Sequence, residues 1–183
     1  MKLEKINWQN LQRVFIAIDA ANLEHSAKEL NMHIRYKLFL DFFAGNTKLV
    51  ATNFYSARFG SASHERFLTF LKKQGFRLIT KPVKTIQDKN EREVRKANFD
   101  VEITADTLNQ LSNFDTLLLF SGDSDFDYLI KLLKEKGKKV FVISSRFHIS
   151  KELVASASRY FDLKIFKGVF LQQQKSPSFP TGS

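Results

Sequence analysis

Short apolar runs alternate with amphipathic stretches along most of the chain. The runs over residues 14–18 and 116–120 are too short for buried helices, so they predict strands covered on both faces. Further strands are predicted over residues 49–55, 76–80, 140–143 and 163–166. Apolar residues at helical spacing predict helices over residues 23–30, 34–43, 63–74, 100–111, 125–136 and 150–158.

This alternation of strands and helices predicts an α/β fold built from βαβ units. We expect a three-layer sandwich with a central, mostly parallel sheet in the strand order 3-2-1-4-5. In that order strands 1 and 4, the two buried runs, are neighbours. One domain is predicted over residues 1–171 with a flexible tail over 172–183, and the helix over 34–43 is expected to stop at Gly45.

Carboxylates cluster where the predicted strands end. Asp19 follows the first strand, and Asp123, Asp125 and Asp127 follow the fourth. Because these strands are neighbours, Asp19 and Asp123 should meet at the carboxyl edge of the sheet, where α/β proteins bind ligands. Acids packed there repel one another unless a cation neutralises them, and clustered oxygens suit Mg²⁺ or Mn²⁺. The alternative is that one Asp caps a helix and the others are solvated.

The chain is strongly basic, with a formal net charge of +10. Residues 72–96 hold nine Lys and Arg against three Asp and Glu, a local balance of +6. This asymmetry indicates a polyanion partner, nucleic acid ahead of a membrane surface, with a solvated loop as the alternative. The cations expected to bind a phosphodiester substrate are Lys81, Lys84, Lys89, Arg95 and Lys96.

Cysteine is absent from the sequence, which excludes disulfides, thiolate metal sites and a cysteine nucleophile. Residues 1–12 lack the apolar segment of a signal peptide, and no apolar run approaches the length of a membrane span. We therefore expect a soluble, cytoplasmic protein without a membrane partner.

Three short motifs follow one another along the chain: Asp19-Ala-Ala-Asn22, Lys96-Ala-Asn-Phe-Asp100-Val-Glu-Ile-Thr-Ala-Asp106 and Phe120-Ser-Gly-Asp123-Ser-Asp125-Phe. They resemble the motifs of the NYN domain family, and more narrowly of its LabA-like branch within the PIN-like nuclease superfamily. The resemblance extends over residues 13–166. It implies an α/β sandwich with a metal-dependent ribonuclease site and single-stranded or structured RNA as the substrate.

By position, the resemblance also implies the site residues. The acidic constellation of the family corresponds to Asp19, Asn22, Asp100, Asp123 and Asp125. Asp127 stands where some related nucleases have a further acid. The chain departs from the family at Ser158, because an Asp is frequent there in a helix before the last strand.

Phosphodiester hydrolysis needs an activated water and neutralised charge on the attacking and leaving oxygens. Two divalent ions about 3.5–4 Å apart supply both, and carboxylates are sufficient to hold them. We assign Asp19 and Asp123, joined by Asp100, as metal ligands, and Asp125 as the ligand of a second ion or the group that orients the water. These four carboxylates would be the catalytic residues, and the cofactor one or two Mg²⁺ or Mn²⁺ ions.

Asn22, Ser121, Asp127 and Asp106 are candidates for supporting roles. Asn22 is suited to bind a ligand water or a phosphate oxygen, and capping a helix is a nearly equal alternative. Ser121 is suited to donate a hydrogen bond to a carboxylate or phosphate, unless it simply ends the strand. Asp106 lies roughly 240° around the helix from Asp100, so the two cannot share one face. Asp106 is therefore assigned either a role in supporting the metal ligands or a structural role. The buried stripe of that helix is expected to hold Val101, Ala105 and Leu108.

Histidines and aromatic residues add less to the prediction. The four histidines lack the spacing of a metal motif: His25, His33, His64 and His148. A metal-free ribonuclease with histidine acid–base groups is therefore not expected. The aromatic residues suited either to base stacking or to the core are Tyr36, Tyr55, Phe59 and Tyr128.

Three functions remain open. The leading one is a ribonuclease dependent on Mg²⁺ or Mn²⁺, with RNA as the partner and a homodimer left open. The alternative is a weakly active or inactive RNA-binding or regulatory adaptor, since a fold does not determine a function. A metal-dependent phosphatase ranks third, because position 21 is Ala and Asp19 therefore lacks an Asp-x-Asp continuation.

Overall fold

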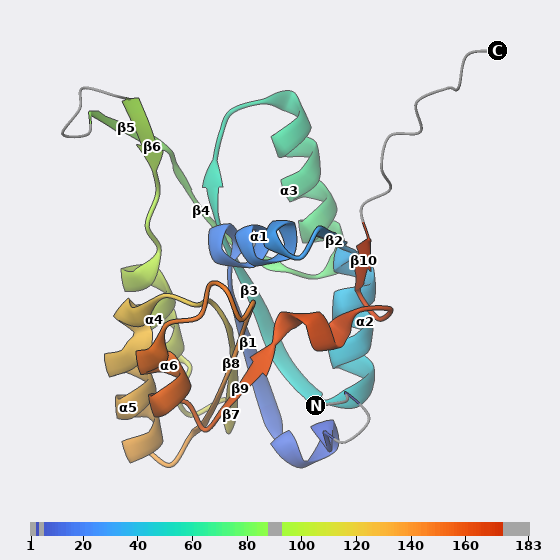
Figure 1. Cartoon of the computed structure of the whole chain (residues 1–183), viewed down its shortest axis with the longest axis vertical. Coiled ribbons are helices and arrows are strands. Elements are labelled where there is room, and N and C mark those ends of the chain that lie inside the picture. The colour runs from blue at the N-terminus through green and yellow to red at the C-terminus, as the bar shows by residue number, and fades with distance from the viewer. Residues whose placement is uncertain (1–2, 4–5, 88–92, 174–183) are drawn as a thin grey trace.

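Six parallel strands form the central sheet, in the order β4-β3-β1-β7-β8-β9 (Figure 1). A computed structural model describes residues 3, 6–87 and 93–173 of the chain. The strands of the sheet are β1 (Arg13–Asp19), β3 (Lys48–Arg58), β4 (Arg77–Pro82), β7 (Thr116–Phe120), β8 (Lys139–Ser144) and β9 (Arg159–Asp162). The predicted order of five strands is confirmed, and β9 adds a sixth strand beside β8.

Helices cover both faces of the sheet, which confirms the predicted three-layer α/β sandwich (Figure 1). One face carries α1 (Ala20–Glu29), α2 (Tyr36–Asn46) and α3 (Ala62–Gln74). The other face carries α4 (Asp100–Asn109), α5 (Asp127–Glu135) and α6 (Lys151–Ser156). Short 3₁₀ helices are η2 (Trp8–Leu11), η3 (Ser124–Phe126) and η4 (Leu163–Phe166). Within the described ranges, every helix falls short of the length and apolarity needed to cross a membrane.

β1 and β7 lie side by side at the centre of the sheet, and the side chains of β1 alternate between its two faces. Ile16 and Ile18 pack into the core under α1 and α2, whereas Phe15 and Ala17 pack into the core under α4 and α5. All four are completely buried, which is why this strand is a continuous apolar run. Ile18 pairs with Phe120, so the residues that follow the two strands leave the sheet at the same edge.

An aromatic cluster fills the core between α2 and the sheet. Phe39 and Phe43 of α2 are completely buried. The ring centroid of Phe39 lies 5.0 Å from that of Phe120 and 4.9 Å from that of Phe170. Trp8 of η2 meets Phe43 edge-on, with the centroids 5.6 Å apart. These contacts join α2, β7 and the last described segment into one core.

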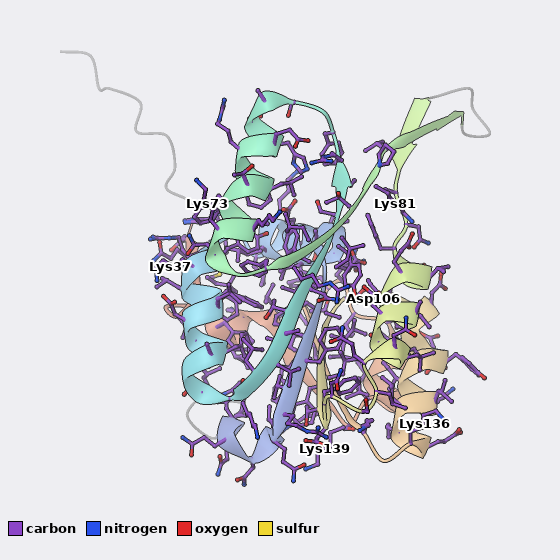
Figure 2. The ribbon with its side chains drawn as sticks, turned by 180° about the vertical axis from the view of Figure 1, so that it is seen from behind. Lys37, Lys73, Lys81, Asp106, Lys136 and Lys139 are labelled. Carbon is purple, nitrogen blue, oxygen red and sulfur yellow. The ribbon has the colours of Figure 1, made fainter. Side chains whose placement is uncertain are left out.

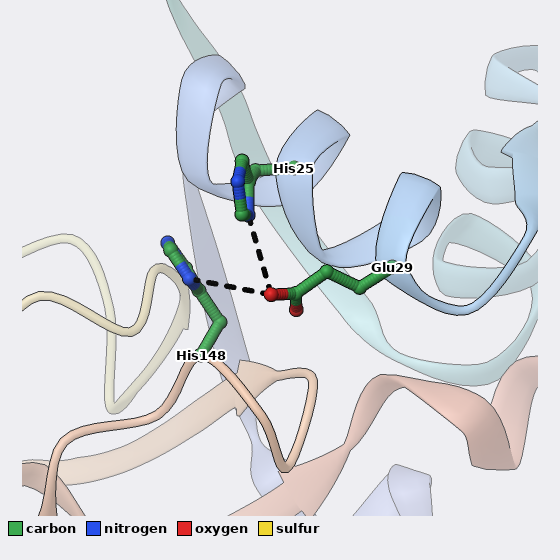
Figure 3. Close-up of side chains that lie close together, drawn as sticks. All are labelled: His25, Glu29 and His148. Carbon is green, nitrogen blue, oxygen red and sulfur yellow. Dashed lines mark ion pairs between the residues drawn. The ribbon is translucent and has the colours of Figure 1, made fainter.

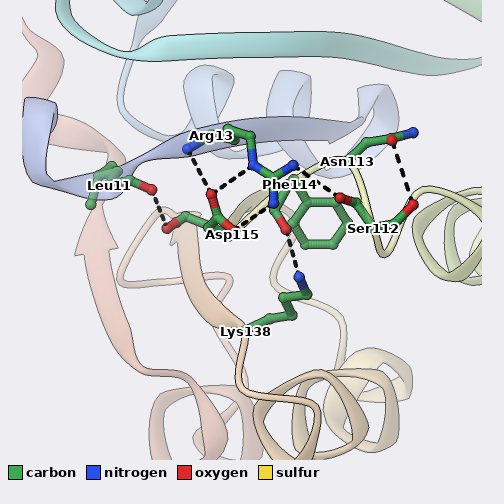
Figure 4. Close-up of polar contacts among 8 residues, drawn as sticks. Leu11, Arg13, Ser112, Asn113, Phe114, Asp115 and Lys138 are labelled. Atoms are coloured by element: carbon green, nitrogen blue, oxygen red, sulfur yellow. Dashed lines mark hydrogen bonds and ion pairs between the residues drawn. The ribbon is translucent and has the colours of Figure 1, made fainter.

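A polar network joins the amino ends of β1 and β7 (Figure 4). Arg13 Nε and Nη2 donate to the two carboxylate oxygens of Asp115 at 2.9 and 2.8 Å, and Nη1 donates to the carbonyl of Ser112. Thr116 Oγ1 donates to the carbonyl of Leu11 at 2.7 Å. The Arg13 guanidinium holds the pKa of Asp115 well below its usual range. The bidentate pair therefore stays ionised and aligns the starts of two strands that are distant in sequence.

The predicted strand over residues 163–166 is wrong, because these residues form η4 and the strand before them is β9. Leu163 and Phe166 are both completely buried in the same core cluster. Their spacing of three suits a 3₁₀ turn, whereas a strand would direct them to opposite faces. Asp162 begins the turn by accepting the N–H of Lys164 at 2.9 Å.

The predicted stop of the second helix at Gly45 is also wrong. α2 continues through this glycine to Asn46. Its end is determined by Thr47, whose N–H and Oγ1 both donate to the carbonyl of Phe43, at 2.9 and 2.7 Å. Because Thr47 provides both donors to this carbonyl, the helix ends at Asn46, one residue after the predicted stop at Gly45.

The buried stripe of α4 differs from the predicted one. Val101 is 78% exposed and Ala105 is exposed as well, whereas Ile103 and Thr107 are completely buried. The N–H of Ile103 bonds the carbonyl of buried Phe99, so the stripe begins at that residue. The helix is thus rotated relative to the prediction, so that Val101 and Ala105 face solvent.

Part of the basic stretch over residues 72–96, for which a solvated loop was the alternative, forms an antiparallel hairpin of β5 (Lys84–Gln87) and β6 (Glu93–Lys96). The hairpin projects beyond the carboxyl edge of the main sheet, above α4 (Figure 1). A second small sheet pairs β2 (Met32–Ile34) with β10 (Leu171–Gln173). Regular structure therefore continues past residue 171, and residues 174–183 of the predicted tail lie outside the described part.

Phe39→Ala tests the aromatic cluster. Removing this buried ring should leave a cavity among four aromatic neighbours and lower the free energy of unfolding by about 3–5 kcal/mol, measured by urea denaturation. Phe70→Ala on α3 is the control, because that ring is 42% exposed and should change stability by less than about 1 kcal/mol. Similar decreases for both variants would contradict this packing.

Candidate metal centre

Three carboxylates converge at the carboxyl edge of the sheet. Each of Asp100, Asp123 and Asp125 offers an oxygen, and these oxygens lie within 4.8 Å of one another. Asp100 opens α4, Asp123 precedes η3 and Asp125 lies within η3, so the exit of β7 meets the start of a helix from elsewhere in the chain. The site is open to solvent, since the first two side chains are half-buried and Asp125 is exposed.

Local hydrogen bonds position these carboxylates. Ser121 Oγ accepts the N–H of Asp123 at 3.2 Å, and Asp123 Oδ1 in turn accepts the N–H of Asp125 at 3.1 Å. Asp123 therefore does cap a helical turn, which was the alternative expected from the sequence, and it also belongs to the cluster. The N–H of Asp100 donates to Asn98 Oδ1 at 2.8 Å, which holds the start of α4.

Asp19 lies at the end of β1 beside this cluster but is not one of the three converging residues. Its side chain is buried, with 9% exposed, and Oδ2 accepts a short hydrogen bond of 2.6 Å from Asn22 Nδ2. Its Oδ1 accepts the N–H of Asn22 at 3.3 Å, so Asp19 itself caps α1. Burial raises the pKa of Asp19, and the hydrogen bonds from Asn22 only partly oppose this.

Asn22 connects the two strand ends. While its Nδ2 donates to Asp19, its Oδ1 accepts the N–H of Gly122 at 3.2 Å. Gly122 is required there, because a Cβ would lie 2.0 Å from the carbonyl oxygen of His148. The N–H of Ser150 donates to the carbonyl of Gly122 at 3.0 Å, so the loop after β8 is seated directly on the exit of β7.

The acids of this edge repel one another electrostatically. Burial raises the pKa of Asp100, and the negative charges of Asp123, Asp125 and Asp19 raise it further. The charge of Asp123 also adds to the raised pKa of Asp19. The donor set is all oxygen, as Mg²⁺ and Mn²⁺ prefer. The residues present therefore fit a hard divalent cation.

Two acids predicted to support the site have other partners. Asp127 accepts from Lys131 Nζ at 2.6 Å, one turn along α5, and this ion pair lowers its pKa. Asp106 accepts from Tyr55 Oη at 3.0 Å and from Asn53 Nδ2 at 3.3 Å. Asp106 therefore ties α4 to β3.

Lys81 is the predicted substrate-binding cation whose side chain the structure describes. Its Nζ bonds Glu102 Oε1 at 2.6 Å and lies 4.6 Å from the ring centroid of Phe99. Figure 2 shows it beside the base of the hairpin, on the same side of the molecule as Asp106. Lys84, Arg95 and Lys96 are described by their backbone in the hairpin, and Lys89 lies outside the described residues.

A pocket of about 390 Å³ adjoins the carboxylates. Asn22 and Asp123 line one part of it, and Phe147, His148 and Ser150 of the loop after β8 line the rest. This loop was not among the predicted site residues, although Arg146-Phe147-His148 lies only two residues after the predicted strand over 140–143 and is a signal for it. The Phe147 ring is 63% exposed, and the guanidinium carbon of Arg146 lies 4.7 Å from its centroid.

The aromatic candidates for base stacking divide between the core and the surface. Tyr36 and Tyr55 belong to the core, whereas Phe59 and Tyr128 are 55% and 75% exposed. Ser158 lies at the opposite edge of the sheet, where its Oγ accepts the N–H of Val140 at 3.0 Å. It thus cannot replace a metal-binding Asp at the carboxyl edge.

Comparisons with known proteins identify similar chains. A family model of the NYN domain matches residues 13–164. Over 169 residues, the chain is 28% identical to the Low amplitude and bright protein LabA of Synechococcus elongatus, with 90% of each chain covered. A protein of unknown function from Vibrio parahaemolyticus has a similar crystal structure, with a TM-score of 0.75 and 22% identity. That match covers 92% of this chain and 99% of the other, and it supports the fold alone.

Asp100→Asn tests the repulsion among the acids in metal-free protein. Because folding raises the pKa of Asp100 above 3.8, the folded state holds this proton more tightly than the unfolded state does. Ionisation of Asp100 therefore lowers the free energy of unfolding as the pH rises from the unfolded-state pKa of 3.8 through the higher folded-state pKa. We expect Asp100→Asn to melt above wild type at pH 7 in EDTA, and the gain to disappear as pH falls below about 3.8.

Asp127→Asn is the matched control, since it removes the same charge from a carboxylate paired with Lys131 and should show no gain. A metal-free Asp100→Asn protein that is less stable than wild type at pH 7 would contradict the repulsion.

Proposed function

Because the chain belongs to the NYN domain family and three carboxylates converge at the carboxyl edge of its sheet, we propose that it is a divalent-metal-dependent ribonuclease. The observation that carries this proposal is the meeting of Asp100, Asp123 and Asp125 within 4.8 Å. The similarity to LabA covers nearly the whole chain and supports the same family assignment.

The protein's part in such a reaction is to hold charge and to position groups. Asp100, Asp123 and Asp125 would hold one or two Mg²⁺ or Mn²⁺ ions, with buried Asp19 contributing the fourth negative charge or ligand. When bound, such ions activate water and neutralise charge on the phosphate oxygens. Hydrolysis then joins a water oxygen to phosphorus as the bond to the leaving oxygen breaks. Asn22 and Ser121 would keep the two strand ends in place during this step.

The loop after β8 is suited to bind the nucleotide next to the scissile phosphate. Phe147 presents an exposed ring at the pocket, where a base can stack, and Arg146 lies against that ring. Both follow the end of β8, at the same edge as the carboxylates. The basic hairpin projects from this edge and would contact the RNA backbone farther along the strand (Figure 1).

Asp123→Asn tests the reaction. The substitution keeps the shape of the side chain but removes a charge that would hold the cation. We expect the rate of labelled RNA cleavage in Mn²⁺ to fall at least about 100-fold, which corresponds to about 2.7 kcal/mol of transition-state stabilisation. Asp41→Asn removes the same charge from an exposed ion pair on α2 and should leave the rate unchanged.

The outcome also separates the competing functions. Equal cleavage by wild type and folded Asp123→Asn, in preparations free of contaminating nuclease, would overturn the catalytic assignment. RNA binding without any metal-dependent turnover by wild type would favour the adaptor. Hydrolysis of a small chromogenic phosphate ester in place of RNA would favour a phosphatase.

The hairpin can be tested through the salt dependence of RNA binding. Replacing Lys84, Lys89 and Lys96 together by Gln should weaken binding and lower the slope of log K against log[salt] by about 0.7 for each RNA phosphate that is no longer neutralised. The matched control replaces three exposed lysines at the amino edge of the sheet: Lys48, Lys136 and Lys139. Figure 2 shows the last two at the opposite end of the molecule from Lys81. An unchanged slope in the hairpin variant would place the RNA path elsewhere.

A further inference from the structure

Two histidines and a glutamate meet beside the pocket, outside the carboxylate cluster (Figure 3). His25 and Glu29 lie one turn apart on α1, and His148 comes from the loop after β8. Each offers a ligand atom, and these atoms lie within 4.8 Å of one another. The spacing of the histidines along the sequence gave no hint of this site, because the two are brought together only by folding.

The distances in this group match a shared cation better than direct hydrogen bonds. His25 Nδ1 lies 3.6 Å and His148 Nδ1 lies 3.9 Å from the same oxygen, Glu29 Oε1. Both distances exceed those of N–H···O hydrogen bonds, which are about 2.7–3.2 Å. Ligand atoms around a tetrahedral ion with bonds of about 2.0–2.1 Å lie about 3.4 Å apart, so the three need only a small inward movement.

The two rings lie close together. The imidazole centroids of His25 and His148 are 4.4 Å apart and the ring planes differ by 31°. A ring nitrogen of each therefore lies within 4.8 Å of the other and of a Glu29 oxygen, so one ion can contact all three. Neutral imidazoles beside a carboxylate are the form that binds a transition metal ion.

Glu29 is already oriented for such a role. Its Oε2 accepts a hydrogen bond of 2.6 Å from Ser145 Oγ, which directs Oε1 toward the two rings. Metal-binding carboxylates are characteristically held by such outer hydrogen bonds. The three side chains remain accessible, with 56%, 28% and 35% of His25, Glu29 and His148 exposed, so an ion can enter from solvent.

We propose that His25, Glu29 and His148 form a second metal site, which binds Zn²⁺ or a similar transition ion and keeps one coordination position open. Two imidazoles and one carboxylate are a donor set that suits such ions, in contrast to the all-oxygen set of the carboxylate cluster. The ion would fasten the loop after β8 to α1. Because that loop also carries Phe147 and rests against Gly122, the second site would hold one wall of the pocket in place.

Zinc titration of the untagged, chelator-stripped full chain tests this site, with MgCl₂ present to occupy the oxygen-only cluster. By calorimetry we expect one Zn²⁺ per chain in wild type. His25→Gln and His148→Gln should each weaken the affinity at least about tenfold, and Ser145→Ala about 10- to 100-fold through Glu29. His33→Gln, at the exposed residue of β2, and Asp123→Asn should both bind Zn²⁺ as wild type does.

Bound Co²⁺ provides a second readout, because its visible spectrum distinguishes a four- or five-coordinate site from the hydrated ion. Loss of that spectrum in His148→Gln would support the site. Circular dichroism of each variant establishes that it is folded. Absence of stoichiometric Zn²⁺ binding in wild type, or equal affinity in wild type and folded His148→Gln, would overturn the proposal. Neither measurement uses RNA, so the result is independent of the ribonuclease assay.

Discussion

The parallel pairing of β1 with β7 is the constraint on which the rest of the structure depends. Both strands are buried on both faces, and their register runs from Val14 opposite Thr116 to Ile18 opposite Phe120. Since parallel strands end at the same edge, the residues that follow each strand must share a small region of space. The core thus determines which residues meet at this edge: Ser121 Oγ donates to Asp19 Oδ2, although the two residues are more than a hundred positions apart.

Charged side chains are arranged in opposite ways at the two edges of this strand pair. At the amino edge, Arg13 and Asp115 form a bidentate ion pair that lowers the pKa of the acid (Figure 4). At the carboxyl edge, acids face acids, and burial with mutual repulsion raises the pKa of Asp100. The first arrangement favours folding, whereas the second opposes it. A bound cation would relieve this repulsion, so the acids support the proposed metal site.

The loop after β8 connects the two proposed metal sites. Its backbone packs against Gly122 so closely that no side chain fits there. It contributes Phe147 to the pocket beside Asp123 and His148 to the group with Glu29. An ion bound by the histidines would therefore act on the same wall that a nucleotide would contact. One short loop would therefore link the position of this pocket wall to the reaction proposed at the carboxylates.

The fold class and the acids at the strand ends could be predicted from the sequence, because periodicity and burial are local properties of a chain. The order of five strands was then predicted from the usual order for that fold class. The sequence was less informative for β9, η4 and the hairpin, where pairing across the sheet decides between strand, turn and loop. Only the tertiary structure set Asp19 behind the converging carboxylates and paired Asp127 with Lys131. It alone brought His25 to His148, because the distance between residues far apart in sequence depends on how the sheet is ordered and packed, which local pattern does not encode.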